Sequence, residues 1–261
     1  LVGGAATAAL MIYAGDSMPT PVLMILMFVA SLAAGMIWGI IPAIFKAYFN
    51  TNETLFTLML NYVAMQIVTF CIVYWENPAG SNTVGIINSA TRAGWLPALG
   101  GLTYGWNVLI VLAFTFGMYI YMKYSKQGYE VAVVGESQDT ARYARINVKR
   151  TIIRTMGISG GICGIAGFLL VSGASHTIST STAGGRGFTA IIVAWLSKFN
   201  AFVMILVSFF LVFMEKGAIQ IASQFNLNEN ASDVITGIIL FFILGSEFFI
   251  RYRIAFTKAH K

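Results

Sequence analysis

The sequence predicts an all-α protein, a polytopic bundle of helices that cross a membrane. Of its 261 residues, 57% are hydrophobic and only 10% are charged, whereas an ordinary soluble domain has about 25% charged residues. Mean hydropathy is +0.77. The apolar residues form continuous runs, unlike the short alternating segments of a membrane barrel. Such runs favour helices, because a helix needs about 20 apolar residues to cross the hydrocarbon core.

Apolar runs and polar segments alternate along the chain, and each long apolar run is an expected span. The expected spans are 1–14 (the tail of a span), 22–41, 55–75, 106–121, 151–172 and 233–250. The span at 22–41 is expected to end near Pro42 and Lys46. Two further runs, 187–197 and 201–214, are too short to cross the membrane alone. They are expected to be short broken helices around the interruption Lys198-Phe199-Asn200.

The chain begins at Leu1, inside an apolar run and without the charged start of a signal peptide. We therefore expect an N-terminally truncated chain that forms one transmembrane domain over residues 1–261. Its longest charged insert is the polar segment 123–150.

The positive charges predict an orientation, because cytoplasmic segments carry an excess of Lys and Arg. If the segment 123–154 is cytoplasmic and the sides alternate, 13 of the 16 basic residues lie on the inner side. These are Lys46, Lys123, Lys126, Arg142, Arg145, Lys149, Arg150, Arg154, Lys198, Arg251, Arg253, Lys258 and Lys261. We therefore expect a multi-pass protein of the cytoplasmic membrane whose C-terminus is cytoplasmic.

The sequence lacks the residue patterns of an enzyme. There is no phosphate-binding G-x-x-x-x-G-K-[ST] loop and no H-E-x-x-H zinc motif. His176 and His260 stand apart from other reactive residues, and Cys71 and Cys163 lie in apolar runs, where cysteine behaves as a small hydrophobe. We expect no catalytic activity, no cofactor and no metal. If nucleotide hydrolysis drives this protein, a separate subunit carries it out.

Polar residues inside the span 55–75 are candidates for a solute pathway. Thr57 and Asn61 are four residues apart and share a helix face, and Gln66 and Thr69 follow. Uncharged hydrogen-bonding side chains in a span suit an uncharged polar solute. The alternative is that Asn61 and Gln66 hold neighbouring helices together. Few ionisable residues lie at mid-membrane depth, which argues against a carrier coupled to protons or sodium.

Glycines mark two further features. Gly157, Gly160, Gly161 and Gly164 form small-xxx-small faces, which predict close helix packing. Gly185-x-Gly187-x-x-Ala190 matches a dinucleotide fingerprint in form, but it follows a Ser/Thr loop and opens a membrane segment, so we reject a nucleotide site. Two alternatives remain: the glycines let the loop turn, or they expose a helix N-terminus to a polar solute.

The polar segment 123–150 is the main candidate for a contact with a partner. Ser137 is a plausible N-cap, and Asp139 lies in the first turn, where the helix dipole favours an anion. The helix continues to Arg145 with small apolar residues at Ala141 and Ala144. A simple connector needs about 2 to 8 residues, so the length favours a docking role. The alternative is a basic loop anchored by lipid phosphates.

Five runs resemble the permease subunits of bacterial ABC importers, in the branched-chain amino acid, ribose and nucleoside group. The residues from Glu130 to Ser137 and from Ala141 to Val148 resemble their coupling-helix region. The runs 158–167 and 185–196 resemble two of their membrane segments, the second through the pattern G-x-G-F-x-x-I-A-V-A-L-L. The run from Thr57 to Tyr62 is similar to the nucleoside branch.

This resemblance implies a function, partners and site residues. The chain would be one permease domain of an ATP-driven import system for a nucleoside or simple sugar, in a bacterial cytoplasmic membrane. Its partners would be an ATP-binding subunit, a second permease subunit and an extracellular solute-binding protein or lipoprotein, without nucleic acid. Coupling to the ATP-binding subunit would fall to Gly135, Glu136, Ser137, Asp139, Thr140, Ala141, Arg142, Tyr143, Ala144 and Arg145. The translocation pathway would include Thr57, Asn61, Gln66, Ser159, Gly185, Gly187 and Phe188.

Two positions depart from the family pattern. Arg145 stands where a glycine is common, so the end of the coupling helix is expected to differ. Lys198-Phe199-Asn200 stands where a proline is usual, so a less sharp break is expected there. A secondary, ion-coupled carrier for a small polar solute is the alternative function.

Overall fold

The computed structural model describes residues 1–225 except Asp16 and Ala79, together with positions 234, 237–239, 241–242 and 245–246. It separates into two compact units, Leu1–Gly184 and Gly185–Lys261, which are described one at a time. Most of the expected last span, 233–250, and all of the basic tail, 251–261, lie outside the described residues. The expected cytoplasmic C-terminus therefore stays a prediction.

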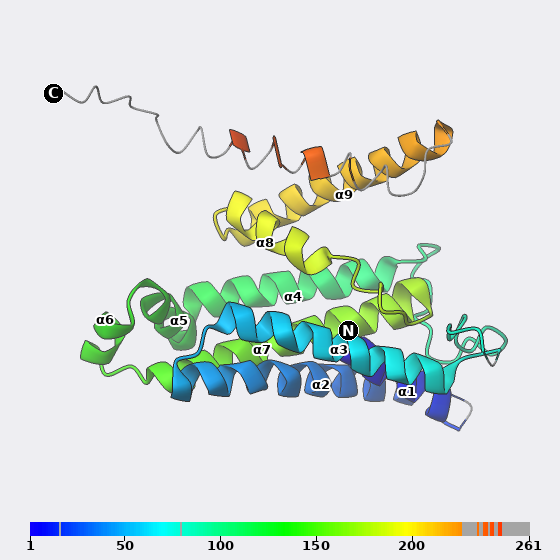
Figure 1. Ribbon diagram of the computed structural model, residues 1–261, viewed down its shortest axis with the longest axis horizontal. Helices are drawn as coiled ribbons and strands as arrows, with labels where there is room; N and C mark the ends of the chain where they lie inside the picture. Colours follow the sequence, from blue (N-terminus) through cyan, green and yellow to red (C-terminus); the bar gives the residue numbers. More distant parts are fainter. Residues whose placement is uncertain are drawn as a thin grey trace. The chain divides into compact units, whose positions relative to one another are not determined.

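Helices form both units (Figure 1). The first unit contains α1 (Val2–Ala14), α2 (Thr20–Phe49), α3 (Glu53–Trp75), α4 (Gly105–Tyr124), α5 (Lys126–Glu136), α6 (Gln138–Tyr143), α7 (Val148–Leu170) and a π-helical turn, η1 (Val171–Ser175). The second contains α8 (Arg186–Leu196) and α9 (Ala201–Gln224). The described residues include no β-strand. Five of these helices are long and apolar enough to cross a membrane, which confirms the all-α membrane bundle.

Two expected boundaries are wrong. Helix α2 does not end near Pro42 but continues to Phe49 with Pro42 inside it. A membrane helix tolerates proline when neighbouring groups satisfy the freed carbonyl. Helix α9 does not stop at Met214 but reaches Gln224, giving 24 residues. The added turns contain Glu, Lys, Ala and Gln, all good helix formers, so polarity alone was a poor signal for a helix end.

The centre of the first unit is a contact between the backbones of α2 and α7. A Cβ atom on Gly39 would lie 3.0 Å from the Cα of Gly160, and one on Gly164 would lie 3.2 Å from the Cα of Gly35. A Cβ on Gly35 would also meet the carbonyl oxygen of Gly160. Only glycine allows two helices to come this close. The predicted packing role of the α7 glycines is thus confirmed.

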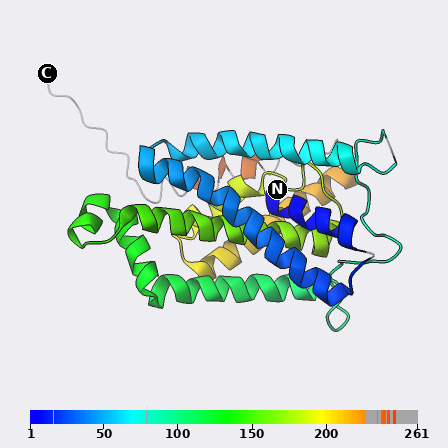
Figure 2. The ribbon, with the colours of Figure 1, turned by 90° about the horizontal axis from the view of Figure 1, so that it is seen from below.

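Helix α1 packs against α7 in the same way. A Cβ on Gly167 would lie 3.2 Å from the Cα of Gly4, and Gly3 lies against Gly164. Buried hydroxyls within these helices bond to their own backbone, as Thr7 does to the Gly3 carbonyl at 2.9 Å. Figure 2 shows α3 along one edge of this unit and α4 along the other, with α2 and α7 between them. Helix α7 is therefore the packing centre of the unit.

The loop 76–104 is fastened to one end of the bundle, opposite the end that carries α5 and α6 (Figures 1 and 2). The Trp95 indole N–H donates to the Ile87 carbonyl at 2.9 Å, and its ring stacks on His176 with centroids 3.8 Å apart. Burial lowers the pKa of the His176 imidazole. The Asn88 side-chain amide donates to the Met11 carbonyl at 2.8 Å, which ties the loop to α1.

We expect Gly164→Ala to lower the free energy of unfolding by about 1–3 kcal/mol, the usual cost of overpacking a tight core. The added methyl group would meet the Ser31 carbonyl and the Gly35 Cα. Thermal unfolding of the purified protein in detergent measures the effect. Gly117→Ala is the matched control, because nothing lies within 4 Å of its Cβ position and alanine is the better helix former. Equal melting temperatures for the two variants would contradict the packing argument.

Candidate functional site

A cavity of about 230 Å³ lies between α2, α3 and α7 in the first unit. Helix α3 contributes Thr57, Asn61 and Ala64 to its lining. The facing walls are largely glycine, from Gly35 and Gly39 on α2 and from Gly160 and Gly164 on α7. The structure therefore brings the predicted residues Thr57 and Asn61 together at one cavity. The glycines that let α2 and α7 touch also form the cavity's backbone wall.

The described side chains that can form hydrogen bonds in this cavity are uncharged. The Thr57 hydroxyl donates to the Glu53 carbonyl of its own helix at 2.8 Å, so towards a solute it can only accept. Among the described residues, the hydrogen-bond partner of the Asn61 amide is the Met65 sulfur at 4.0 Å, a weak contact that leaves the amide open to a new partner. Among the residues that the structure describes, no Asp, Glu, Lys, Arg or His side chain lines the cavity. Its chemistry suits a neutral solute with hydroxyl or amide groups.

The other predicted pathway residues do not line this cavity. Gln66 is exposed further along α3. Ser159 borders a separate, mostly apolar pocket of about 180 Å³ that shares Cys163 with the cavity. Gly185, Gly187 and Phe188 belong to the second unit. There Gly185 adopts a left-handed conformation, with φ of 69°, and forms the N-cap of α8, so the loop does turn at this glycine.

The polar segment 123–150 folds into two helices, α5 and α6, joined at Ser137. The Ser137 hydroxyl accepts a hydrogen bond from the Thr140 N–H at 3.3 Å, so the predicted N-cap is present. Asp139 pairs with Arg142 at 3.3 Å, with side chains 82% and 68% exposed. Such exposed pairs add little stability. Helix α6 was expected from the sequence, whereas α5 was not distinguished within the segment.

The two faces of α6 differ in burial. Ala141 is fully buried against the bundle, whereas Tyr143 is 91% exposed. Gly135, Glu136, Thr140 and Ala144 are also exposed. The surface that α6 offers to a partner is thus centred on Tyr143 rather than on Ala141, which anchors the helix.

Arg145 ends α6 in a left-handed conformation, with φ of 57°. Its N–H bonds to the Arg142 carbonyl at 3.0 Å, and the Ile146 N–H bonds to the Ala141 carbonyl at 2.9 Å. This pair of bonds is the Schellman motif, in which glycine is the usual residue at the left-handed position. Lys198 occupies the equivalent position after α8, with φ of 50°. Both departures from the family pattern are therefore at helix ends that have a left-handed residue.

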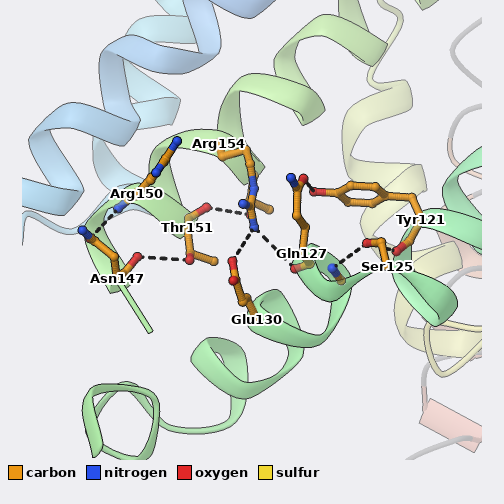
Figure 3. A network of polar contacts seen from close by, with 10 residues as sticks. Tyr121, Ser125, Gln127, Glu130, Asn147, Arg150, Thr151 and Arg154 are labelled. Atoms are coloured by element: carbon orange, nitrogen blue, oxygen red, sulfur yellow. Dashed lines mark hydrogen bonds and ion pairs between the residues drawn. The ribbon is translucent and has the colours of Figure 1, made fainter. Parts of the chain in front are cut away.

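An ion pair joins α5 to α7. The Arg154 guanidinium donates to Glu130 at 3.1 Å and to the Gln127 carbonyl at 3.4 Å. The two charged side chains are only 24% and 23% exposed, and Figure 3 shows them pointing at each other between the two helices. The Tyr121 hydroxyl bonds to the Gln127 side chain at 3.1 Å, which adds α4 to the network. A displacement of α5 would thus act directly on α7.

Sequence reasoning missed this ion pair. Glu130 and Arg154 are 24 positions apart, so no helical spacing connects them. The only signal was that each charge lies beside an apolar span.

A sequence model of the family described as branched-chain amino acid transport system / permease component matches residues 1–244. The chain belongs to this family. Members of this family are transport components rather than enzymes. Together with the five helices that are long and apolar enough to cross a membrane, membership shows that the chain is a multi-pass membrane protein.

Several curated relatives are ABC transporter permeases. The chain is 28% identical over 251 residues to a glucose ABC transporter permease, TsgB13, of Haloferax volcanii, covering 91% of this chain and 65% of the relative. It is 28% identical over 243 residues to a guanosine ABC transporter permease, NupP, of Bacillus subtilis, covering 92% and 70%. A nucleoside ABC transporter permease, NupB, of Lactococcus lactis is 26% identical over 245 residues, covering 90% and 67%.

The permease-family chain spans about two thirds of the length of these relatives. No solved structure matches it. The resemblance to nucleoside and sugar permeases is confirmed by the relatives. The roles of individual site residues, and the boundaries of the coupling segment, stay predictions.

We expect Glu130→Gln to lower the free energy of unfolding by about 1–3 kcal/mol, because it leaves the half-buried Arg154 without its carboxylate. Thermal unfolding in detergent measures the loss. Asp139→Asn is the matched control: it removes the acid of the exposed pair with Arg142, which contributes about 1 kcal/mol at most. If the control lowers the free energy of unfolding as much as Glu130→Gln does, the burial of the Glu130–Arg154 pair is not the reason for its contribution to stability.

Proposed function

We propose that this chain is the membrane-spanning permease subunit of an ATP-driven ABC importer. It forms the pathway for a small, uncharged polar solute, of which a nucleoside or a simple sugar is the best fit. The single observation that carries the proposal is the uncharged cavity at Thr57 and Asn61 in a chain of this family. The names of the relatives, a glucose, a guanosine and a nucleoside permease, favour the same two solute classes.

The size of the cavity supports a mechanism with two states. At about 230 Å³ it is smaller than the roughly 300–1,000 Å³ of typical ligand sites. A solute would therefore require α3 to separate from the α2 and α7 pair. Helix α3 has few buried residues, namely Ala64, Val68 and Ile72. It is thus the wall of the cavity that can move at the lowest energetic cost.

An ATP-binding subunit is the proposed source of that movement. The chain itself has no phosphate-binding loop, and α6 offers an exposed surface around Tyr143. Force on α6 would pass through α5 and the Glu130–Arg154 pair to α7. A second permease subunit and an extracellular solute-binding protein or lipoprotein complete the proposed complex, and α6 would then lie in the cytoplasm.

The alternative, an ion-coupled carrier, is less well supported. Coupling to protons or sodium requires ionisable or oxygen-rich groups at the solute site. The described lining offers the Asn61 amide, the Thr57 hydroxyl, the Trp38 indole and the Cys163 thiol, and the Thr57 hydroxyl is already bonded within α3.

We expect Asn61→Leu to weaken solute binding roughly fivefold, the effect of losing about one net hydrogen bond. The measurement is ATP-driven uptake of labelled guanosine and of labelled glucose by vesicles that hold the complete transporter, with ionophores to collapse ion gradients. Thr115→Val is the matched control, since its hydroxyl bonds only to the Val111 carbonyl of α4. Normal uptake by a folded Asn61→Leu protein would refute the pathway. Uptake that needs an ion gradient and not ATP would refute the importer.

We expect Tyr143→Ala to weaken co-purification of the ATP-binding subunit about tenfold or more, as removal of an exposed aromatic anchor often does. Tyr143 is a better target than Ala141, because a charge at the buried Ala141 would disrupt α6 itself. The control is Tyr74→Ala, which removes a tyrosine that is 74% exposed. Tyr74 lies at the C-terminal end of α3 and is not part of α6. Unchanged co-purification of the Tyr143→Ala protein would exclude α6 as the docking surface.

A further inference from the structure

A second hollow lies where α2 ends and α7 begins. It has a volume of about 480 Å³, and we call it the basic groove. The last turn of α2 contributes Lys46 and Tyr48, helix α6 contributes Arg142, and the first turn of α7 contributes Lys149. It is separate from the cavity at Asn61, with which it shares no lining residue.

Three cations and no carboxylate line the basic groove among the residues that the structure describes. These cations are Lys46, Arg142 and Lys149. Among the ion pairs of the described residues, neither lysine has an acidic partner. The acid that pairs with Arg142 is exposed and outside the groove. The Lys149 ammonium instead lies 4.6 Å from the centre of the Tyr48 ring. Two lysines without an acidic partner in the ion pairs of the described residues, together with Arg142, attract an anion to this hollow.

The groove lies at the level where a membrane meets water. Helices α2 and α7 are both apolar spans, and the groove is at the last turn of one and the first turn of the other. Beside Lys46, the rings of Phe45, Tyr48 and Phe49 are all exposed. Exposed aromatic rings together with lysines are typical of the lipid headgroup region. Lysine stems extend along apolar surface and bring their charges to that level.

We propose that the basic groove binds the phosphate of an anionic phospholipid. The phosphate would accept hydrogen bonds from Lys46, Lys149 and Arg142, and its acyl chains would lie along the exposed rings of Phe45 and Phe49. A lipid fits better than a soluble anion because exposed aromatic rings lie near Lys46 in the last turns of α2. Since Arg142 belongs to α6 and both lysines to spans, the bound lipid ties α6 to the membrane-spanning helices. This inference goes beyond the proposed function and does not depend on the identity of the solute.

The test is thermal unfolding of the full-length transporter in detergent, with added phosphatidylglycerol or the same amount of phosphatidylcholine. We expect phosphatidylglycerol to raise the melting temperature more, and the difference to shrink at high salt. Lys46→Gln and Lys149→Gln should each weaken phosphatidylglycerol binding roughly fivefold, the effect of one basic residue near an anionic surface. Lys126→Gln is the matched control, since Lys126 is exposed on α5 and does not line the groove. Lys46→Arg and Lys149→Arg should retain binding.

Three results would overturn the proposal. Equal stabilisation by the two lipids would mean that the groove does not recognise charge. Stabilisation by millimolar inorganic phosphate to the same extent would make a free anion the ligand. If the lysine variants release the ATP-binding subunit while the effect of phosphatidylglycerol persists, the groove is a protein interface. Uptake is not part of this test, so a failure of the proposed importer and a failure of lipid binding remain distinguishable.

Discussion

The first unit depends on one contact, the meeting of two glycine-faced backbones at α2 and α7. Dispersion between closely packed helices is the main attraction available to them in lipid, because lipid tails are as apolar as leucine. Gly35 and Gly39 on α2 face Gly160 and Gly164 on α7. Helix α1 then packs against α7 beside this contact, through Gly3 and Gly4. The remaining helices, α3 and α4, lie along the edges of this tightly packed centre.

Two polar networks of the first unit lie at the two ends of this centre (Figure 1). At one end, the loop 76–104 is held by Trp95 stacked on His176. At the other, Arg154 joins α7 to α5, and α5 leads to α6. In the proposed importer, a displacement of α6 would reach the glycine contact through one ion pair. The same centre that gives the unit its stability would then be the part on which the ATP-binding subunit acts.

Sequence alone predicted the fold class, most spans, the N-cap at Ser137 and the glycine packing, because each depends on residues that are close along the chain. It failed at Pro42 and Met214, where the surrounding helix overrides a local signal. It brought Thr57 and Asn61 to one face correctly but also included Gln66, which lies away from the cavity. The Glu130–Arg154 pair and the basic groove were beyond prediction, since tertiary packing alone brings those residues together.

The glycines shared by the helix contact and the cavity restrict how the solute preference of the proposed importer could change during evolution. Gly35, Gly39, Gly160 and Gly164 belong both to the helix contact and to the cavity lining. Any side chain introduced there to reshape the cavity would also push α2 and α7 apart. In the proposed importer, selectivity would therefore change mainly through side chains outside this contact, such as Thr57, Asn61 and Ala64 of α3. Paralogues with different solutes should diverge along that one helix face while the opposite wall stays bare backbone.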